Sequence, residues 1–121
     1  MQALLVVTAV VEGATGLALV ALPSRLAMLL LGSSLDAPAA LTMARVAGVA
    51  LVALAAGCWL MRLEGPSRAA RSLVAAMAIY HTGVALVLAY AGLGFALSGL
   101  GLWPTVVAHA AMTAWCLKQS R

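Results

Sequence analysis

Four long apolar stretches, separated by short polar or turn-forming segments, fill nearly all of this chain. A helix that crosses a membrane needs about 20 mostly apolar residues. The pattern therefore predicts four membrane-crossing helices, at approximately residues 3–22, 39–61, 70–91 and either 96–117 or 103–117. The last helix has two expected starts because residues 92–101 are apolar but rich in glycine. That segment either begins the helix or forms a loop that dips into the membrane.

Turn-forming residues mark the breaks between these stretches. Pro23-Ser24 ends the first stretch, and Asp36-Ala37-Pro38 is a start signal for the second. Gly65-Pro66-Ser67 separates the second stretch from the third. A second apolar patch, Leu26 to Leu31, is too short to cross a bilayer. We expect this patch to lie at the membrane interface as a turn of helix.

Composition supports the same fold class. The 121 residues are 65% hydrophobic and 8% charged, which is more apolar surface than a small soluble domain can bury. The apolar stretches are continuous instead of alternating, which argues against a β-barrel. We predict an all-α polytopic membrane protein, an antiparallel bundle of four helices in a single domain over residues 1–121. The start lacks a basic leader, so the first helix is expected to be retained.

The positions of lysine and arginine predict the topology. One side of the membrane would hold five of them (Arg62, Arg68, Arg71, Lys118 and Arg121), and the other side would hold Arg25 alone. The positive-inside rule then places both termini in the cytoplasm. Trp59 and Trp115 would lie at the inner interface, and Tyr90 and Trp103 at the outer one. The Ala-, Leu- and Arg-rich composition is typical of a bacterial inner membrane.

The net charge of +4 does not indicate a nucleic-acid partner, because the basic residues flank the helices and set topology instead. Cys58 and Cys116 are expected near the cytoplasmic helix ends, in a reducing compartment, as packing residues. The expected surroundings are the lipid bilayer, with a small lipophilic molecule, further copies of the chain or a larger membrane complex as candidate partners. No phosphate-binding, nucleophile-elbow or carboxylate-cluster motif is present, and we predict no cofactor and no metal site.

Each apolar stretch contains a residue that can carry charge: Glu12, Arg45, His81 and His109. Such residues are costly in a bilayer and often functional. From the expected helix ends, Glu12 and His81 would lie near the midplane, and Arg45 and His109 roughly 10 Å below the outer boundary. We therefore expect a polar site between the midplane and the outer third of the membrane.

Glu12 and Arg45 form the strongest expected pair, because an isolated charge in hydrocarbon must find a partner. An ion pair would fix the helix register, or it would orient a ligand. On the fourth helix, Thr105, His109 and Thr113 recur every four residues and share one face. Hydroxyl groups also bond back to their own helix, which is the structural alternative for these threonines.

The two histidines allow three interpretations. They can be buried residues with hydrogen-bond partners, an acid and a base that move protons near neutral pH, or ligands of haem or a metal. No HExxH or ExxH spacing supports the third interpretation. Tyr80 precedes His81 and can donate a hydrogen bond, although it points about 100° away around the helix.

Apolar walls with a few convergent polar groups favour a pocket for a small lipophilic molecule. The chemistry would be proton transfer, as in isomerisation, cyclisation or epoxide opening. We predict Glu12, His81 and His109 as catalytic residues. The predicted ligand-binding residues are Arg45, Tyr80, Trp103, Thr105 and Thr113.

Two other functions remain open. The first is a non-catalytic subunit or assembly factor of a larger membrane complex, a role common among small polytopic chains. The second is proton-coupled export, because the chain resembles the small multidrug resistance exporters in its length, its number of helices and a glutamate in the first helix. The chain departs from that family in its five-to-one Lys/Arg bias and in the aromatic and glycine pattern of its third helix.

Overall fold

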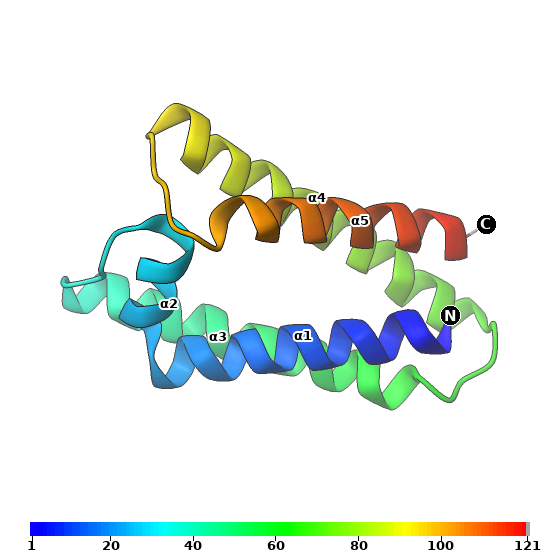
Figure 1. The fold of residues 1–121 in the computed structure, drawn as a ribbon. Coiled ribbons are helices and arrows are strands. Elements are labelled where there is room, and N and C mark those ends of the chain that lie inside the picture. The colour runs from blue at the N-terminus through cyan, green and yellow to red at the C-terminus, as the bar shows by residue number, and fades with distance from the viewer. Residues whose placement is uncertain (121) are drawn as a thin grey trace. The chain divides into compact units, whose positions relative to one another are not determined.

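The computed structural model describes residues 1–120, and these residues form five α-helices and no strand. The helices are α1 (Gln2–Ala21), α2 (Pro23–Leu31), α3 (Pro38–Met61), α4 (Arg68–Gly94) and α5 (Leu102–Gln119) (Figure 1). Three of them, α1, α3 and α4, are long and apolar enough to cross a membrane. The all-helical prediction is confirmed for the described residues, and three helices that could cross a membrane are consistent with a multi-pass membrane protein.

The chain divides into two compact units. The first comprises residues 1–28 and 33–64, and the second comprises residues 29–32 and 65–120 of the described chain. In the first unit α1 packs along α3, and in the second α4 packs along α5. Each unit is therefore built on one pair of helices.

Small residues bring α1 and α3 close together. Gly16 and Gly48 face each other, and a Cβ built on either glycine would lie 2.7 Å from the carbonyl oxygen of the other. One turn earlier on α1, Gly13 faces Ala55, at 3.4 Å from its built Cβ to that of the alanine. In lipid, such residues let backbones approach closely and gain dispersion contacts. The close approach of α1 and α3 therefore depends on the small residues at these positions.

The α4–α5 pair is antiparallel. Gly92 near the end of α4 lies against Leu102 and Trp103 at the start of α5, and Thr82 lies against Thr113 further along. A Cβ on Gly92 would approach the Leu102 side chain to 2.9 Å. The glycine is therefore a site of close packing inside α4, where the sequence suggested the end of the helix.

The segment between α4 and α5 is neither helical nor strand. Ala96 adopts a left-handed conformation (φ 53°), which lets the Leu97 N–H donate to Ala91 O at 3.2 Å and ends α4. The Gly101 N–H donates to Leu29 O at 2.9 Å, so this segment is anchored on the end of α2. The expectation that residue 96 begins the last helix is wrong, because this turn intervenes and α5 begins at Leu102.

The other helix starts follow their local signals. α3 begins with Pro38 in its first turn. Proline lacks a backbone N–H, and an N–H at this position would have no partner within the helix. α4 begins after Ser67, whose hydroxyl oxygen accepts a hydrogen bond from the Ala70 N–H at 3.1 Å. Residues 26–31 belong to a nine-residue helix, α2, somewhat longer than the turn of helix expected there.

Candidate functional site

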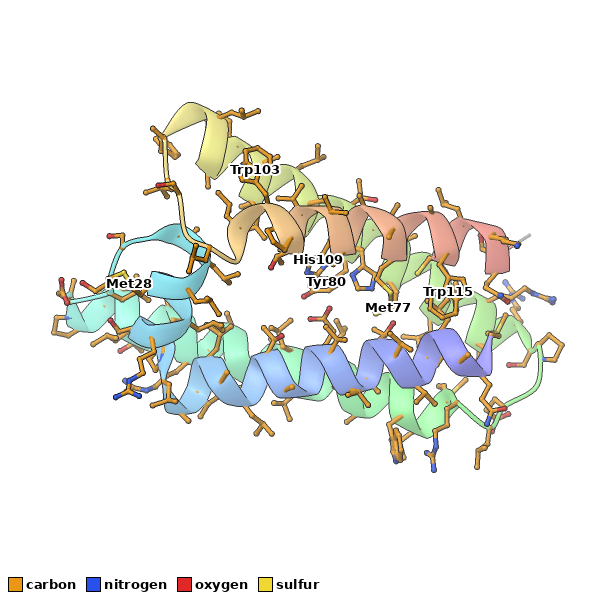
Figure 2. The ribbon with its side chains drawn as sticks, in the orientation of Figure 1. Met28, Met77, Tyr80, Trp103, His109 and Trp115 are labelled. Atoms are coloured by element: carbon orange, nitrogen blue, oxygen red, sulfur yellow. The ribbon has the colours of Figure 1, made fainter. Side chains whose placement is uncertain are left out.

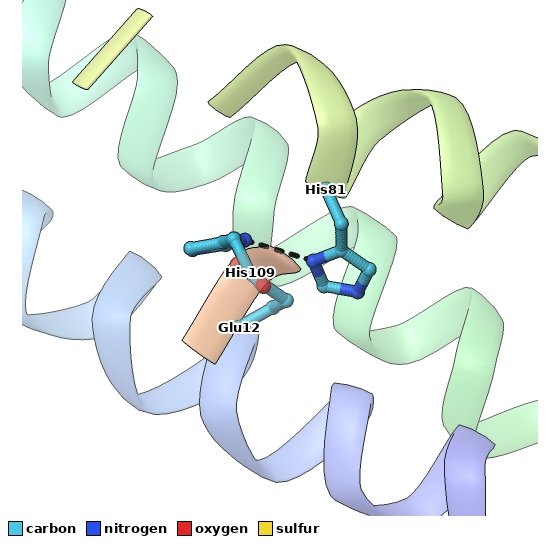
Figure 3. A group of neighbouring side chains, drawn as sticks. All are labelled: Glu12, His81 and His109. Carbon is cyan, nitrogen blue, oxygen red and sulfur yellow. Dashed lines mark hydrogen bonds between the residues drawn. The ribbon is translucent and has the colours of Figure 1, made fainter. Parts of the chain in front are cut away.

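His81 and His109 bond directly to each other. Their Nδ1 atoms lie 2.9 Å apart, which joins the middle of α4 to the middle of α5 (Figure 3). His81 is 1% exposed, and His109 is half-buried. Two of the predicted site residues are thus brought together.

The bond fixes how protons are shared between the rings. A neutral imidazole has one N–H donor and one lone-pair acceptor. For the two Nδ1 atoms to bond, one ring donates a hydrogen and the other presents its lone pair. The ring centroids are 5.0 Å apart and the ring planes are inclined by 47°. Within the pair, one ring therefore donates its Nδ1 hydrogen and the other ring accepts it.

Tyr80 completes an aromatic group around the pair. Its ring centroid lies 5.1 Å from that of His81 and 5.9 Å from that of His109, the second contact edge to face (Figure 2). Tyr80 and His81 are adjacent on α4. His109 reaches both rings from α5, which packs along α4. Aromatic rings prefer edge-to-face or offset arrangements of this kind over face-to-face stacking. Although Tyr80 and His81 leave α4 in directions about 100° apart, their rings are in contact.

A second polar pair lies close by, and sequence reasoning missed half of it. The Oγ1 atoms of Thr82 and Thr113 are 3.3 Å apart. Thr113 is a predicted site residue, whereas Thr82 was not singled out. Thr82 could in principle have been found from the sequence, because it follows His81 directly. Antiparallel packing that brings His81 to the middle of α5 also brings Thr82 near that helix.

Both of these hydroxyls bond back to their own helices. Thr82 donates to Ala78 O at 2.7 Å, and Thr113 donates to His109 O at 3.0 Å. The structural alternative considered for the threonines thus applies to Thr113. It also applies to Thr42, whose hydroxyl donates to Pro38 O at 2.8 Å.

Glu12 lies on α1 in the first unit, in the middle of that helix. It is 1% exposed and belongs to a buried stripe with Thr8 and Gly16, one turn away on either side. Residues four apart share one face of a helix, so this stripe is a single buried face of α1. A carboxyl group in the middle of an apolar helix is the feature that singles Glu12 out chemically.

The expected Glu12–Arg45 ion pair is a wrong prediction. Arg45 is exposed, and its Nε donates to Val20 O at 3.3 Å. Val20 is eight residues beyond Glu12 on α1, about 12 Å along the axis. The last carbonyls of a helix have no partner within it, and a cationic side chain there is favourable. Arg45 therefore binds the C-terminal end of α1.

The remaining predicted residues lie nearer the start of α5. Trp103 packs against Gly92 and is 46% exposed, and Thr105 is half-buried one helical turn before His109. Trp103 and Trp115 lie near opposite ends of α5 (Figure 2). Tyr90 contacts Phe95 at the Trp103 end, with ring centroids 5.2 Å apart. Tyr90 and Trp103 thus occupy the same end of their unit.

No protein-family model matches the chain, and no curated protein or solved structure matches it either.

Proposed function

We propose that the protein binds a small lipophilic molecule within the bilayer and transfers protons to and from it through His81 and His109. The observation that carries this proposal is the 2.9 Å contact between their Nδ1 atoms. One imidazole of such a pair takes a proton while the other gives one, and general acid–base catalysis requires both steps.

The position of each titratable residue along its own helix supports the proposal. Glu12 is central in α1 (Gln2–Ala21), His81 in α4 (Arg68–Gly94) and His109 in α5 (Leu102–Gln119). If each helix crosses the membrane, all three residues lie near the midplane. We propose α5 as the fourth crossing helix, because it packs antiparallel along α4. Glu12 is the proposed third group, which exchanges the proton with the ligand or with water.

The proposed reaction is a proton transfer without an external oxidant or reductant. In an isomerisation, the ring whose Nδ1–H donates within the pair uses its Nε2 lone pair to remove a proton from a C–H group beside a carbonyl. That ring passes its Nδ1 hydrogen to the other ring, whose Nε2–H returns a proton elsewhere on the same molecule. In epoxide opening, one ring protonates the epoxide oxygen while water adds to carbon and gives its extra proton to the other ring. Cyclisation likewise begins with protonation of an epoxide or alkene and ends with loss of a proton. Tyr80 would orient the rings.

The test uses the purified chain in liposomes of bacterial lipid extract made up in D₂O. Mass spectrometry is then used to search for lipophilic molecules that gain deuterium, or the elements of D₂O, only when the protein is present. We expect at least one such species, and its formation should fall about 100-fold or more in His109→Gln, as loss of an acid–base group implies. Thr42→Val is the matched control, because that exposed hydroxyl bonds only its own helix.

Two results would replace this proposal. A chain that is unstable in detergent unless a second protein co-purifies would favour a subunit or assembly role. Substrate-driven proton release from liposomes that is abolished in Glu12→Gln would favour proton-coupled export.

A further inference from the structure

A groove opens along the exposed side of the α4–α5 pair. It has a volume of about 420 Å³ and is lined by Ala78, Ile79, Thr82, Gly83, Leu86, Thr113 and Leu117. Neither histidine lines it, so it is distinct from the imidazole pair. Its lining is apolar except for the two threonine hydroxyls. Gly83 leaves space there, because a Cβ built on it would meet nothing within 4 Å.

The hydroxyl hydrogens of Thr82 and Thr113 are used in bonds to their own helices. Each hydroxyl has a single hydrogen. Thr82 gives its hydrogen to Ala78 O and Thr113 gives its hydrogen to His109 O, since carbonyl oxygens only accept. While both hydrogens are used in this way, the 3.3 Å contact between the two Oγ1 atoms, in which either atom could otherwise donate, has no hydrogen between them. The groove therefore presents two neighbouring acceptor oxygens, Oγ1 of Thr82 and Oγ1 of Thr113. A ligand that bonds to them must supply a hydrogen-bond donor.

The location restricts what that donor is. Thr82 lies close to the middle of α4, a helix long and apolar enough to cross the membrane. A charged ammonium or phosphate headgroup would be costly at that depth. An uncharged hydroxyl group costs far less and donates the one hydrogen that the two oxygens can share. The rest of the occupant must be apolar, because the walls offer no other polar group.

We propose that this groove binds a single-chain lipid alcohol, with its hydroxyl shared between Thr82 and Thr113 and its apolar chain lying along Gly83 and Leu86. The chain fits beside Gly83 because that residue carries no side chain. This binding site goes beyond the proton-transfer function, and it stands whether or not the histidines are catalytic.

The test compares two photoreactive probes in nanodiscs that contain the full chain. One probe is a long-chain primary alcohol with a diazirine in its tail, and the other is its methyl ether, which has no donor hydrogen. We expect the alcohol to label peptides containing Ile79–Leu86 or Thr113–Leu117 at least fivefold more than the ether. Equal labelling by both probes in the unmodified protein would overturn the proposal, because an adventitious apolar contact does not need the hydroxyl.

Variants sharpen the result. Thr82→Val with Thr113→Val keeps the shape and removes both acceptors, so the preference for the alcohol should disappear while ether labelling stays unchanged. Gly83→Leu should reduce labelling by both probes, because its side chain fills the groove. Gly57→Leu is the matched control, since Gly57 is also helical with open space around it, in the other unit. Unchanged alcohol preference in the double valine variant, or unchanged labelling in Gly83→Leu, would refute the site.

Discussion

Gly16 of α1 and Gly48 of α3 lie backbone to backbone, and a Cβ on either would come within 2.7 Å of the other's carbonyl oxygen. That contact is closer than real Cβ atoms tolerate, and the obstacle is backbone instead of a flexible side chain. The helices can keep this separation only if both positions remain glycine. A single methyl group added at either glycine would therefore push α1 and α3 apart.

Gly16→Ala and Gly48→Ala are expected to destabilise the protein by about 1–3 kcal/mol each, as overpacking of a tight interface typically does. Denaturant titration in detergent micelles measures the change. Gly57→Ala is the control, with nothing within 4 Å of its Cβ, and should change the free energy of unfolding little. Equal stability of all three variants would show that α1 and α3 are not packed at this distance.

Glu12 and Arg45 should act independently. Arg45 binds Val20 O at the end of α1, so no ion pair couples it to Glu12. In a double-mutant cycle with Glu12→Gln and Arg45→Gln, the effects on the free energy of unfolding should add to within about 0.5 kcal/mol. A coupling energy well above 1 kcal/mol would restore the ion pair that the sequence suggested.

The connection between α4 and α5 depends on Gly99. A Cβ on this residue would collide with backbone atoms of Leu29 and Leu30. Gly99→Ala should therefore detach the connection from the end of α2, and the Gly101 N–H, which donates to Leu29 O, should exchange with solvent faster. Hydrogen-exchange mass spectrometry reports this directly. Gly65→Ala, with open space at its Cβ, should leave that exchange unchanged.

The proposed topology, including the fourth crossing helix, is tested with single cysteines at exposed positions. We expect a membrane-impermeant maleimide to label Ser34→Cys on intact cells. Glu64→Cys and Lys118→Cys should react only after lysis. The native Cys58 and Cys116 are fully buried and give little background. Labelling of Lys118→Cys on intact cells would mean that α5 does not cross the membrane.

The helices could be predicted because short local sequence signals determine where they begin. Apolar runs and turn residues such as Pro38 and Ser67 place α3 and α4 within two residues of their observed starts. The end of α4 was predicted at residue 91 but lies at Gly94. The glycines there pack closely against α5, and Ala96 makes the left-handed turn that glycine usually makes.

The site was predictable in its residue types and only partly in its pairings. An ionisable side chain in an apolar helix is visible in the sequence, and His81 and His109 do pair. Their partner choice depends on the rotation and register of two packed helices, which local sequence does not specify. Arg45 illustrates the limit, because the carbonyl that it binds is exposed only where α1 ends beside α3. Thr82 was missed for the same reason.

The hydrogen shared by His81 and His109 is observed most directly by solid-state NMR of the ¹⁵N-histidine-labelled protein in lipid. We expect a through-bond correlation between the two Nδ1 nuclei, with one protonated and one not, and its loss in His109→Gln. Two Nδ1 resonances without any mutual correlation, both protonated or both bare, would contradict the imidazole pair on which the proposed function rests.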